Sequence, residues 1–178
     1  SYFIRLAGCD VGCVWCDVKE SWNLREDQFQ HIPDVIMHGK QISDNCSFAV
    51  ITGGEPFMHD MNELTNALHK HGYEIAVETS GVHPYSGEFD WVCLSPKKFK
   101  PTLPAFYKLA NELKIIVYNK SDFAFAQEQA SKVSNACKLY LQPEWERSEA
   151  MIPEIISFIH ENPEWNISLQ THKFMNIP

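Results

Sequence analysis

The amino-acid sequence predicts an α/β fold with a mostly parallel sheet, either open or curled into part of a barrel. Seven short apolar or β-branched runs alternate with longer segments of helical periodicity, which is typical of this class. A cluster of polar or glycine residues directly follows nearly every one of these runs. Because ligands bind at the carboxyl ends of strands in such sheets, we expect the clusters to form one site.

The apolar runs and the periodic segments between them give the order of the elements. The expected strands are Tyr2–Leu6, Phe48–Ile51, Glu74–Thr79, Trp91–Leu94, Leu113–Val117, Leu139–Gln142 and Ile167–Leu169. The clearest helices span about 61–71, 122–133 and 148–161. Asp60 can cap the first helix and Gly72 suits its C-terminal end, whereas Pro153 should break or begin the last.

Length, charge and hydropathy limit the classes of function. The chain has 178 residues, which suits a single domain, and it contains no apolar run of the ~20 residues that a membrane helix needs. Its formal net charge is -8, and the one short basic run is at 97–100, which argues against nucleic-acid binding. We therefore expect a cytoplasmic protein, without membrane attachment, that acts on a small molecule.

Three cysteines near the start of the chain, Cys9, Cys13 and Cys16, form a Cys-x3-Cys-x2-Cys loop. Three thiolates can hold a four-iron, four-sulfur cluster and leave the fourth iron open for a ligand. A zinc site normally has a fourth ligand nearby, and the first histidine is His31. The spacing alone leaves both kinds of site open. Disulfides are not expected, because the other cysteines lie in apolar runs: Cys46, Cys93 and Cys137.

The polar segments after later strands carry groups suited to ligand binding. Gly53 and Gly54 would let the backbone approach a ligand closely or turn sharply. Carboxylates and hydroxyls follow in the same segments: Glu55, Glu78, Ser80 and Ser95. Taken singly, each of these residues also fits an ordinary turn or a solvated loop.

Taken together, the segments resemble a known superfamily. The cysteine loop, with Trp15 before its last cysteine, and the later Gly53-Gly54-Glu55-Pro56 resemble the radical S-adenosylmethionine (SAM) enzymes. Four further segments resemble one family among them, the 7-carboxy-7-deazaguanine synthases of queuosine biosynthesis: Glu78-Thr79-Ser80-Gly81, Ser95-Pro96-Lys97, Leu141-Gln142-Pro143 and Leu169-Gln170-Thr171-His172-Lys173. This resemblance implies one radical SAM domain over residues 1–178, with the sheet curled into a partial (βα)6-type barrel.

The resemblance also implies an activity. Such a lyase binds SAM at the open iron of a 4Fe-4S cluster and, after reduction, releases a 5′-deoxyadenosyl radical. The radical takes a hydrogen from 6-carboxy-5,6,7,8-tetrahydropterin, whose skeleton contracts to 7-carboxy-7-deazaguanine with loss of ammonia. The family further implies an electron donor such as flavodoxin and a homodimer.

Site residues follow from the resemblance where the motifs align. The cluster ligands would be Cys9, Cys13 and Cys16. The SAM pocket would contain Gly53, Gly54, Glu55, Glu78, Ser80, Ser95, Lys97 and Gln142. The substrate would contact Arg5, whose guanidinium suits a carboxylate, and also Thr52, His172 and the terminal Pro178.

The sequence departs from the family pattern in two places. The family usually has threonine after Cys-Asp, where its hydroxyl helps to hold magnesium, but here Val18 follows Asp17. Asp17 remains a candidate magnesium ligand, although we do not expect magnesium dependence. The chain also begins at Ser1, after the position of a Gln-Gly-Glu-Gly-like segment that contacts the pterin. We expect that a short N-terminal segment is missing and that these residues bind SAM better than substrate.

Two other functions remain open from sequence. A glycyl-radical enzyme activase would share the cysteine loop and SAM but would act on a polypeptide. A non-catalytic module would hold zinc with the same three cysteines.

Overall fold

A computed structural model describes residues 1–176 of the chain. Seven parallel strands form one sheet in the order in which they occur along the sequence, which confirms the expected α/β fold. The strands are β1 (Tyr2–Leu6), β2 (Phe48–Gly53), β3 (Glu74–Thr79), β4 (Trp91–Leu94), β5 (Glu112–Val117), β6 (Lys138–Pro143) and β7 (Trp165–Ile167). The α-helices are α1 (Ile32–Ile42), α2 (Asn62–Lys70), α3 (Pro104–Leu109), α4 (Ser121–Ala130), α5 (Ser148–Glu161) and α6 (Thr171–Met175).

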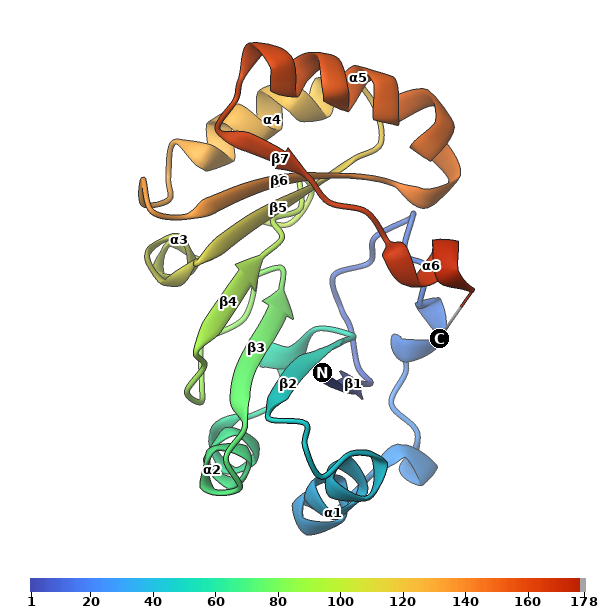
Figure 1. The fold of residues 1–178 in the computed structure, drawn as a ribbon, viewed down its shortest axis with the longest axis vertical. Coiled ribbons are helices and arrows are strands. Elements are labelled where there is room, and N and C mark those ends of the chain that lie inside the picture. Colours follow the sequence, from blue (N-terminus) through green and yellow to red (C-terminus); the bar gives the residue numbers. More distant parts are fainter. Residues whose placement is uncertain (177–178) are drawn as a thin grey trace.

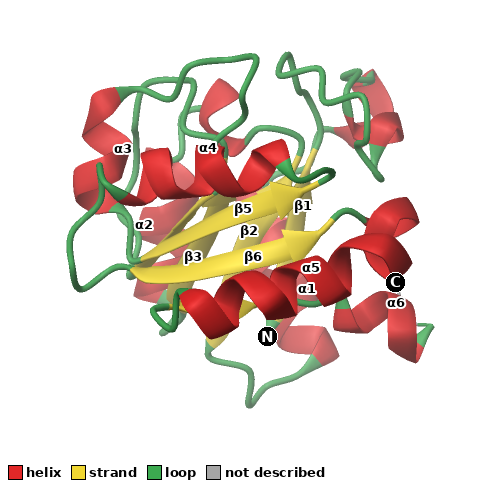
Figure 2. Ribbon diagram, turned by 90° about the horizontal axis from the view of Figure 1, so that it is seen from above, coloured by secondary structure: helices red, strands yellow, loops and turns green. Residues whose placement is uncertain are grey.

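The sheet curls without closing, as expected for a partial barrel. Figure 1 shows the strands as an arc from β1 to β7, with α1, α2, α4 and α5 outside it and the segment after β1 on its open side. Figure 2 shows β5 and β6 running in the same direction. Alternation along β5 separates the two faces, since Leu113, Ile115 and Val117 are buried while the residues between them are partly exposed. The core therefore lies between the sheet and the outer helices.

The structure differs from the prediction at several element ends and at one proline. The last strand covers Trp165–Ile167 rather than 167–169, because Trp165 is buried in the core and pairs with Leu139, whereas Leu169 is exposed. The helix α4 ends at Ala130, three residues earlier than expected. The helix α5 runs through Pro153, which is exposed, so that solvent can reach the carbonyl group that proline leaves without a partner.

The connection between β3 and β4 contains no helix in the described structure, and aromatic side chains pack at this point instead. The ring of Phe57 lies 5.1 Å from that of Phe106 and 5.2 Å from that of Tyr85. These contacts shield the core where other connections use a helix.

The ends of α2 follow the sequence prediction, whereas three helices were not anticipated. Asp60 Oδ1 accepts a hydrogen bond from Asn62 N (3.0 Å), and Gly72 adopts a φ of 80° after the last turn. The unanticipated helices are α1, α3 and α6. In residues 1–176 we find no helix with the length and hydropathy needed to cross a bilayer.

Candidate active site

The face of the sheet turned away from the helices carries the predicted polar residues. Arg5 on β1 lies in register with Thr52 on β2, and Thr52 Oγ1 donates to Glu78 Oε2 on β3 (3.4 Å). At the far end of the strand order, Gln142 Oε1 on β6 accepts a hydrogen bond from Ser168 Oγ, directly after β7 (3.3 Å). The fold thus places residues from separate segments on one concave surface.

Glu78 is held by a cation that the sequence did not reveal as part of the site. Lys114 Nζ on β5 lies 2.8 Å from Glu78 Oε1. Burial raises the pKa of Glu78, but the Lys114 charge and hydrogen bond, with a smaller contribution from Thr52, lower it overall. Glu78 therefore presents an ionised acceptor to the concave side.

The cysteine loop leaves β1 and is fixed by backbone hydrogen bonds. Gly8 N donates to Ser21 O (2.7 Å), and Cys9 N donates to Trp22 O (3.1 Å). Gly8 has a φ of 96°, a conformation that favours glycine. The loop geometry is therefore set by the segment that follows it as well as by the strand before it.

The three predicted cluster ligands lie together on this loop, and all are partly exposed free thiols. Burial raises the pKa of Cys9, and the charges of Glu55 and Cys16 add to this rise, whereas backbone hydrogen bonds from Val11 and Gly12 partly oppose it. Burial also raises the pKa of Cys13, and the charge of Lys97 partly opposes this rise. Within residues 1–176 no three His, Cys, Asp or Glu side chains converge on one metal ion. Three free thiols on one loop, each able to bind a separate iron, match the donor set of a 4Fe-4S cluster.

The predicted Gly53-Gly54 pair packs directly against the cysteine loop. Gly54 N donates to Leu6 O (2.7 Å), and a Cβ atom at Gly54 would lie 2.1 Å from Gly8 O. Gly53 has a φ of 112°, and a Cβ atom there would lie 2.3 Å from Leu6 O. Close packing of two backbone segments thus explains both glycines, while their contact with a cofactor stays a prediction.

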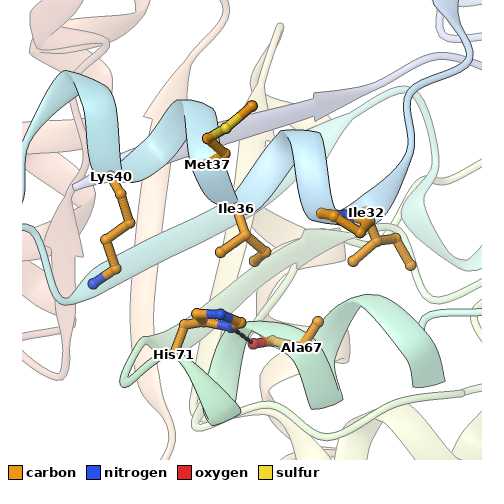
Figure 3. Close-up of a pocket in the computed structure, with 7 residues that line it drawn as sticks. Ile32, Ile36, Met37, Lys40, Ala67 and His71 are labelled. Carbon is orange, nitrogen blue, oxygen red and sulfur yellow. Dashed lines mark hydrogen bonds between the residues drawn. The ribbon is translucent and has the colours of Figure 1, made fainter.

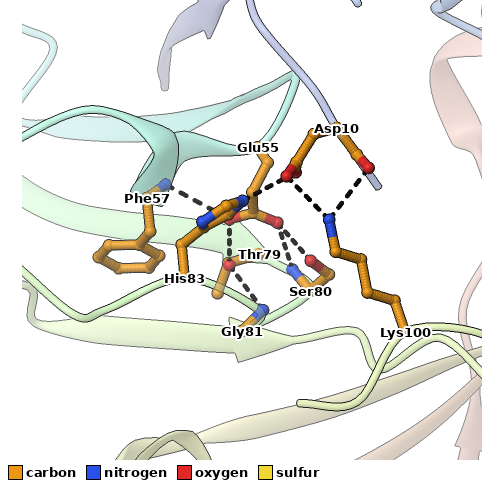
Figure 4. Close-up of polar contacts among 8 residues, drawn as sticks. All are labelled: Asp10, Glu55, Phe57, Thr79, Ser80, Gly81, His83 and Lys100. Atoms are coloured by element: carbon orange, nitrogen blue, oxygen red, sulfur yellow. Dashed lines mark hydrogen bonds and ion pairs between the residues drawn. The ribbon is translucent and has the colours of Figure 1, made fainter. Parts of the chain in front are cut away.

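Glu55 is buried, with 2% of its surface exposed, and both of its carboxylate oxygens accept hydrogen bonds within the chain (Figure 4). Oε1 accepts from Thr79 Oγ1 (2.5 Å) and Phe57 N (3.3 Å). Oε2 accepts from the backbone N (2.9 Å) and Oγ (2.5 Å) of Ser80. Glu55 and Ser80 therefore connect the end of β2 to the end of β3, and a direct ligand contact for either residue stays a prediction.

A second polar group, absent from the sequence prediction, ties the cysteine loop to the segments around β4. Asp10 Oδ1 lies 2.7 Å from His83 Nε2, and Asp10 Oδ2 lies 2.9 Å from Lys100 Nζ (Figure 4). The hydrogen bonds from His83 and Lys100 lower the pKa of Asp10. The only sequence signal was an acidic residue beside Cys9, which does not identify partners more than 70 residues away.

The predicted residues Ser95 and Lys97 contact each other at the end of β4. Lys97 Nζ donates to Ser95 O (2.6 Å) and to Ser95 Oγ (2.7 Å). Burial lowers the pKa of Lys97 overall, and the negative charge of Cys13, on the cysteine loop, partly opposes this shift. This arrangement supplies positive charge beside the cluster ligands.

The predicted magnesium ligand Asp17 contacts the C-terminal segment instead. Its Oδ2 atom lies 2.7 Å from Lys173 Nζ and accepts from Gln170 Nε2 at 2.7 Å. Burial raises the pKa of Asp17, but these two partners lower it overall. Val18 adds no oxygen ligand, so a magnesium ion would have to displace Lys173, and this donor set does not fit the ion.

Two predicted substrate contacts belong to the C-terminal segment. His172 is a partly exposed residue of α6, whose neighbour Phe174 packs against Trp145 with ring centroids 5.4 Å apart. The helix therefore lies over the carboxyl end of β6. Pro178 is outside the described residues.

A cavity of about 400 Å³ lies elsewhere, between α1 and α2 on the outer side of the sheet (Figure 3). Its lining includes Ile32, Ile36, Met37 and Lys40 of α1, with His71 opposite them. No residue of the predicted site lines it, so the concave face remains the candidate active site.

Comparisons with known proteins agree with this interpretation. A model of the radical SAM superfamily matches residues 3–113. A 7-carboxy-7-deazaguanine synthase of Flavobacterium psychrophilum is 49% identical over 100% of this chain and 83% of the relative. One from Synechocystis is 45% identical over 99% of this chain and 84% of the relative. The crystal structure of QueE from Escherichia coli, 30% identical, has a TM-score of 0.77 over 94% of this chain and 84% of that chain. Sequence, fold and site together place this chain in the radical SAM superfamily, among the 7-carboxy-7-deazaguanine synthases.

Proposed function

We propose that this enzyme converts 6-carboxy-5,6,7,8-tetrahydropterin to 7-carboxy-7-deazaguanine in queuosine biosynthesis. The observation that carries the proposal is the convergence of the cysteine loop, the Glu55 network and the concave polar face at the carboxyl ends of the strands. An activase would need an open groove for a polypeptide, and the zinc module would need no polar face. The ring-contracting synthase accounts for all three features.

The protein residues divide the work of holding the reactants. Cys9, Cys13 and Cys16 would hold a 4Fe-4S cluster which, with SAM, supplies radical hydrogen abstraction. Residues around the polar face would orient SAM: Gly53, Gly54, Glu55, Glu78, Ser80, Ser95, Lys97 and Gln142.

The substrate would lie farther toward β1. The guanidinium of Arg5 is exposed on the concave side and can form two parallel hydrogen bonds with the pterin carboxylate. Thr52 adjoins it in register, and His172 of α6 and Pro178 would be further contacts. We assign no step to magnesium, because Lys173 already neutralises Asp17. A flavodoxin-like donor would deliver the electrons, and we propose a homodimer as the assembly.

The test is an anaerobic assay of the reconstituted, reduced protein with SAM and 6-carboxytetrahydropterin. Mass spectrometry should detect both 5′-deoxyadenosine and 7-carboxy-7-deazaguanine. Cys13→Ala should lose cluster iron and both products, whereas the control Cys46→Ala, outside the loop, should retain them. Deoxyadenosine without the deazapurine would contradict the proposed substrate, and a colourless protein that binds only zinc would contradict the proposed chemistry.

A further inference from the structure

The pairing between β4 and β5, which we call the seam, is the shortest strand pairing in the sheet. Only two residue pairs join these strands in register, compared with five between β1 and β2 and six between β5 and β6. The proposed site uses residues from both sides of this seam, with Thr52 and Glu78 before it and Gln142 after it. An interaction that crosses this seam would therefore help to hold the two parts of the concave face together.

Lys114 provides such a connection. It belongs to β5, yet its ammonium lies 2.8 Å from the carboxylate of Glu78 on β3, so the side chain reaches across β4. Only 13% of the Lys114 side chain is exposed, whereas Glu78 retains 43% of its side-chain exposure. Lys114 thus contacts one oxygen of Glu78 from within the protein and leaves the carboxylate accessible from the concave side.

We propose that Lys114 is a positioning residue for SAM binding: it fixes the Glu78 carboxylate and holds β3 and β5 in the relative position that SAM binding requires. This inference rests on the proposed function, because that function gives Glu78 its role as a SAM contact. Lys114 itself need not touch the ligand.

The surroundings of Lys114 support a permanent cation. Burial lowers its pKa, but the negative charge that Cys93 carries only when ionised and the carboxylate of Glu78, which contacts Lys114 directly, raise it above its usual value, with a smaller contribution from Glu112. Cys93 lies in register with Glu78 on one side and with Glu112 on the other. Lys114 is therefore set among groups of three adjacent strands, and it remains charged as their counterion.

The experiment compares three variants of the full chain. Lys114→Met removes the charge and keeps much of the side-chain length, while Lys114→Arg keeps the charge. The control Lys132→Met removes another lysine from an ion pair of similar length, 2.7 Å to Glu128 Oε1, near the end of α4. Isothermal titration of each anaerobically reconstituted, unreduced protein with SAM gives its Kd, after iron content and melting temperature have been measured.

We expect the Kd for SAM to rise about tenfold in Lys114→Met, because a charge-assisted hydrogen bond no longer fixes Glu78. Lys114→Arg and Lys132→Met should stay within about threefold of the parent protein. An unchanged Kd in folded Lys114→Met with full iron content would reduce the ion pair to a structural role and overturn the proposal.

A second variant keeps the test decisive if Lys114→Met does not fold. Lys114→Gln also removes the charge that faces Glu78 but keeps a polar end in this partly buried place, so we expect a similar rise in the Kd; no rise would overturn the proposal. Product analysis separates this inference from the proposed function. If the parent protein binds SAM and forms deoxyadenosine but no deazaguanine, the substrate assignment fails while the effect of Lys114 on the Kd still stands.

Discussion

Replacement of Glu55 by glutamine tests whether the buried carboxylate organises the ends of β2 and β3. Glutamine has nearly the same shape as glutamate, so no cavity results. It replaces one acceptor oxygen by an NH2 group that can only donate. In either amide orientation this NH2 group faces a backbone N–H, from Phe57 or from Ser80, which cannot reverse its direction.

The expected loss follows from the number of hydrogen bonds. Each carboxylate oxygen accepts two, and a hydrogen bond to a charged group contributes about 1.5 kcal/mol or more. Loss of the backbone bond at one oxygen, where two donors are left facing each other, and weakening of the remaining bonds to a neutral group should together lower the free energy of unfolding by about 3 kcal/mol. For a chain of this length the melting temperature should fall by about 6 to 12 °C.

Urea unfolding of the cluster-free protein, followed by circular dichroism, measures this change. The exposed Glu164→Gln provides a control for loss of one negative charge and should change the free energy of unfolding by less than about 0.5 kcal/mol. If Glu55→Gln loses less than about 1 kcal/mol, the carboxylate is not the saturated acceptor that we describe, and the reasoning is refuted.

Three further predictions concern the packing around the site. Gly54→Ala would place a methyl group 2.1 Å from a carbonyl oxygen of the cysteine loop and should cost about 3 kcal/mol in urea unfolding, with reduced iron content after reconstitution. The control Gly12→Ala, at a φ of 74° with no described atom within 4 Å of the methyl, should cost only about 1 kcal/mol; equal costs would contradict the steric argument. Asp17→Asn should lose at most about 1 kcal/mol at pH 7, because its ion pair with Lys173 is partly exposed. Burial raises the pKa of Asp17, but its partners Lys173 and Gln170 lower it overall. The stability that the ionised carboxylate contributes is therefore complete above the ordinary pKa of 3.8, and it disappears as the pH falls through the lower pKa of the folded state. A difference in the free energy of unfolding between the parent protein and Asp17→Asn that grew on acidification would contradict this. Phe106→Ala should lower the free energy of unfolding by about 4 kcal/mol, since the ring is fully buried against Phe57 and Tyr85, and a loss below about 2 kcal/mol in urea unfolding would show that the aromatic cluster is not needed there.

Most of the sheet could be predicted from the sequence because its strands are short apolar or β-branched runs, several of which are buried over consecutive residues. The prediction failed where a tertiary contact outweighed the local pattern, as at Trp165, whose burial moves the last strand two residues toward the N-terminus. The helix α1 shows the same limit. It contains Gly39, a poor helix former, but a Cβ atom there would lie 2.8 Å from Cε1 of Tyr2, a contact between distant segments that the sequence does not display.

The site could be predicted in its residue types but not in its partners. The sequence indicated that Glu55 and Glu78 could accept hydrogen bonds. Only the structure shows that Ser80 donates to Glu55 and that Lys114 forms an ion pair with Glu78. A signal for Lys114 was present, because a charged residue alternates with buried apolar ones along β5. That pattern places a charge on the concave face, but it does not specify which strand carries the opposite charge.

The contact between Gly54 and the cysteine loop has a consequence for the order in which the enzyme matures. The loop is shaped by Gly8 O accepting from Glu55 N (2.8 Å), and Glu55 is in turn anchored to Ser80, so a local segment depends on a chain of contacts spanning more than 70 residues. The thiols therefore reach their final arrangement only after the first three strands have assembled. We therefore expect iron and sulfide to enter a folded apoprotein, so that metal binding is not the event that starts folding.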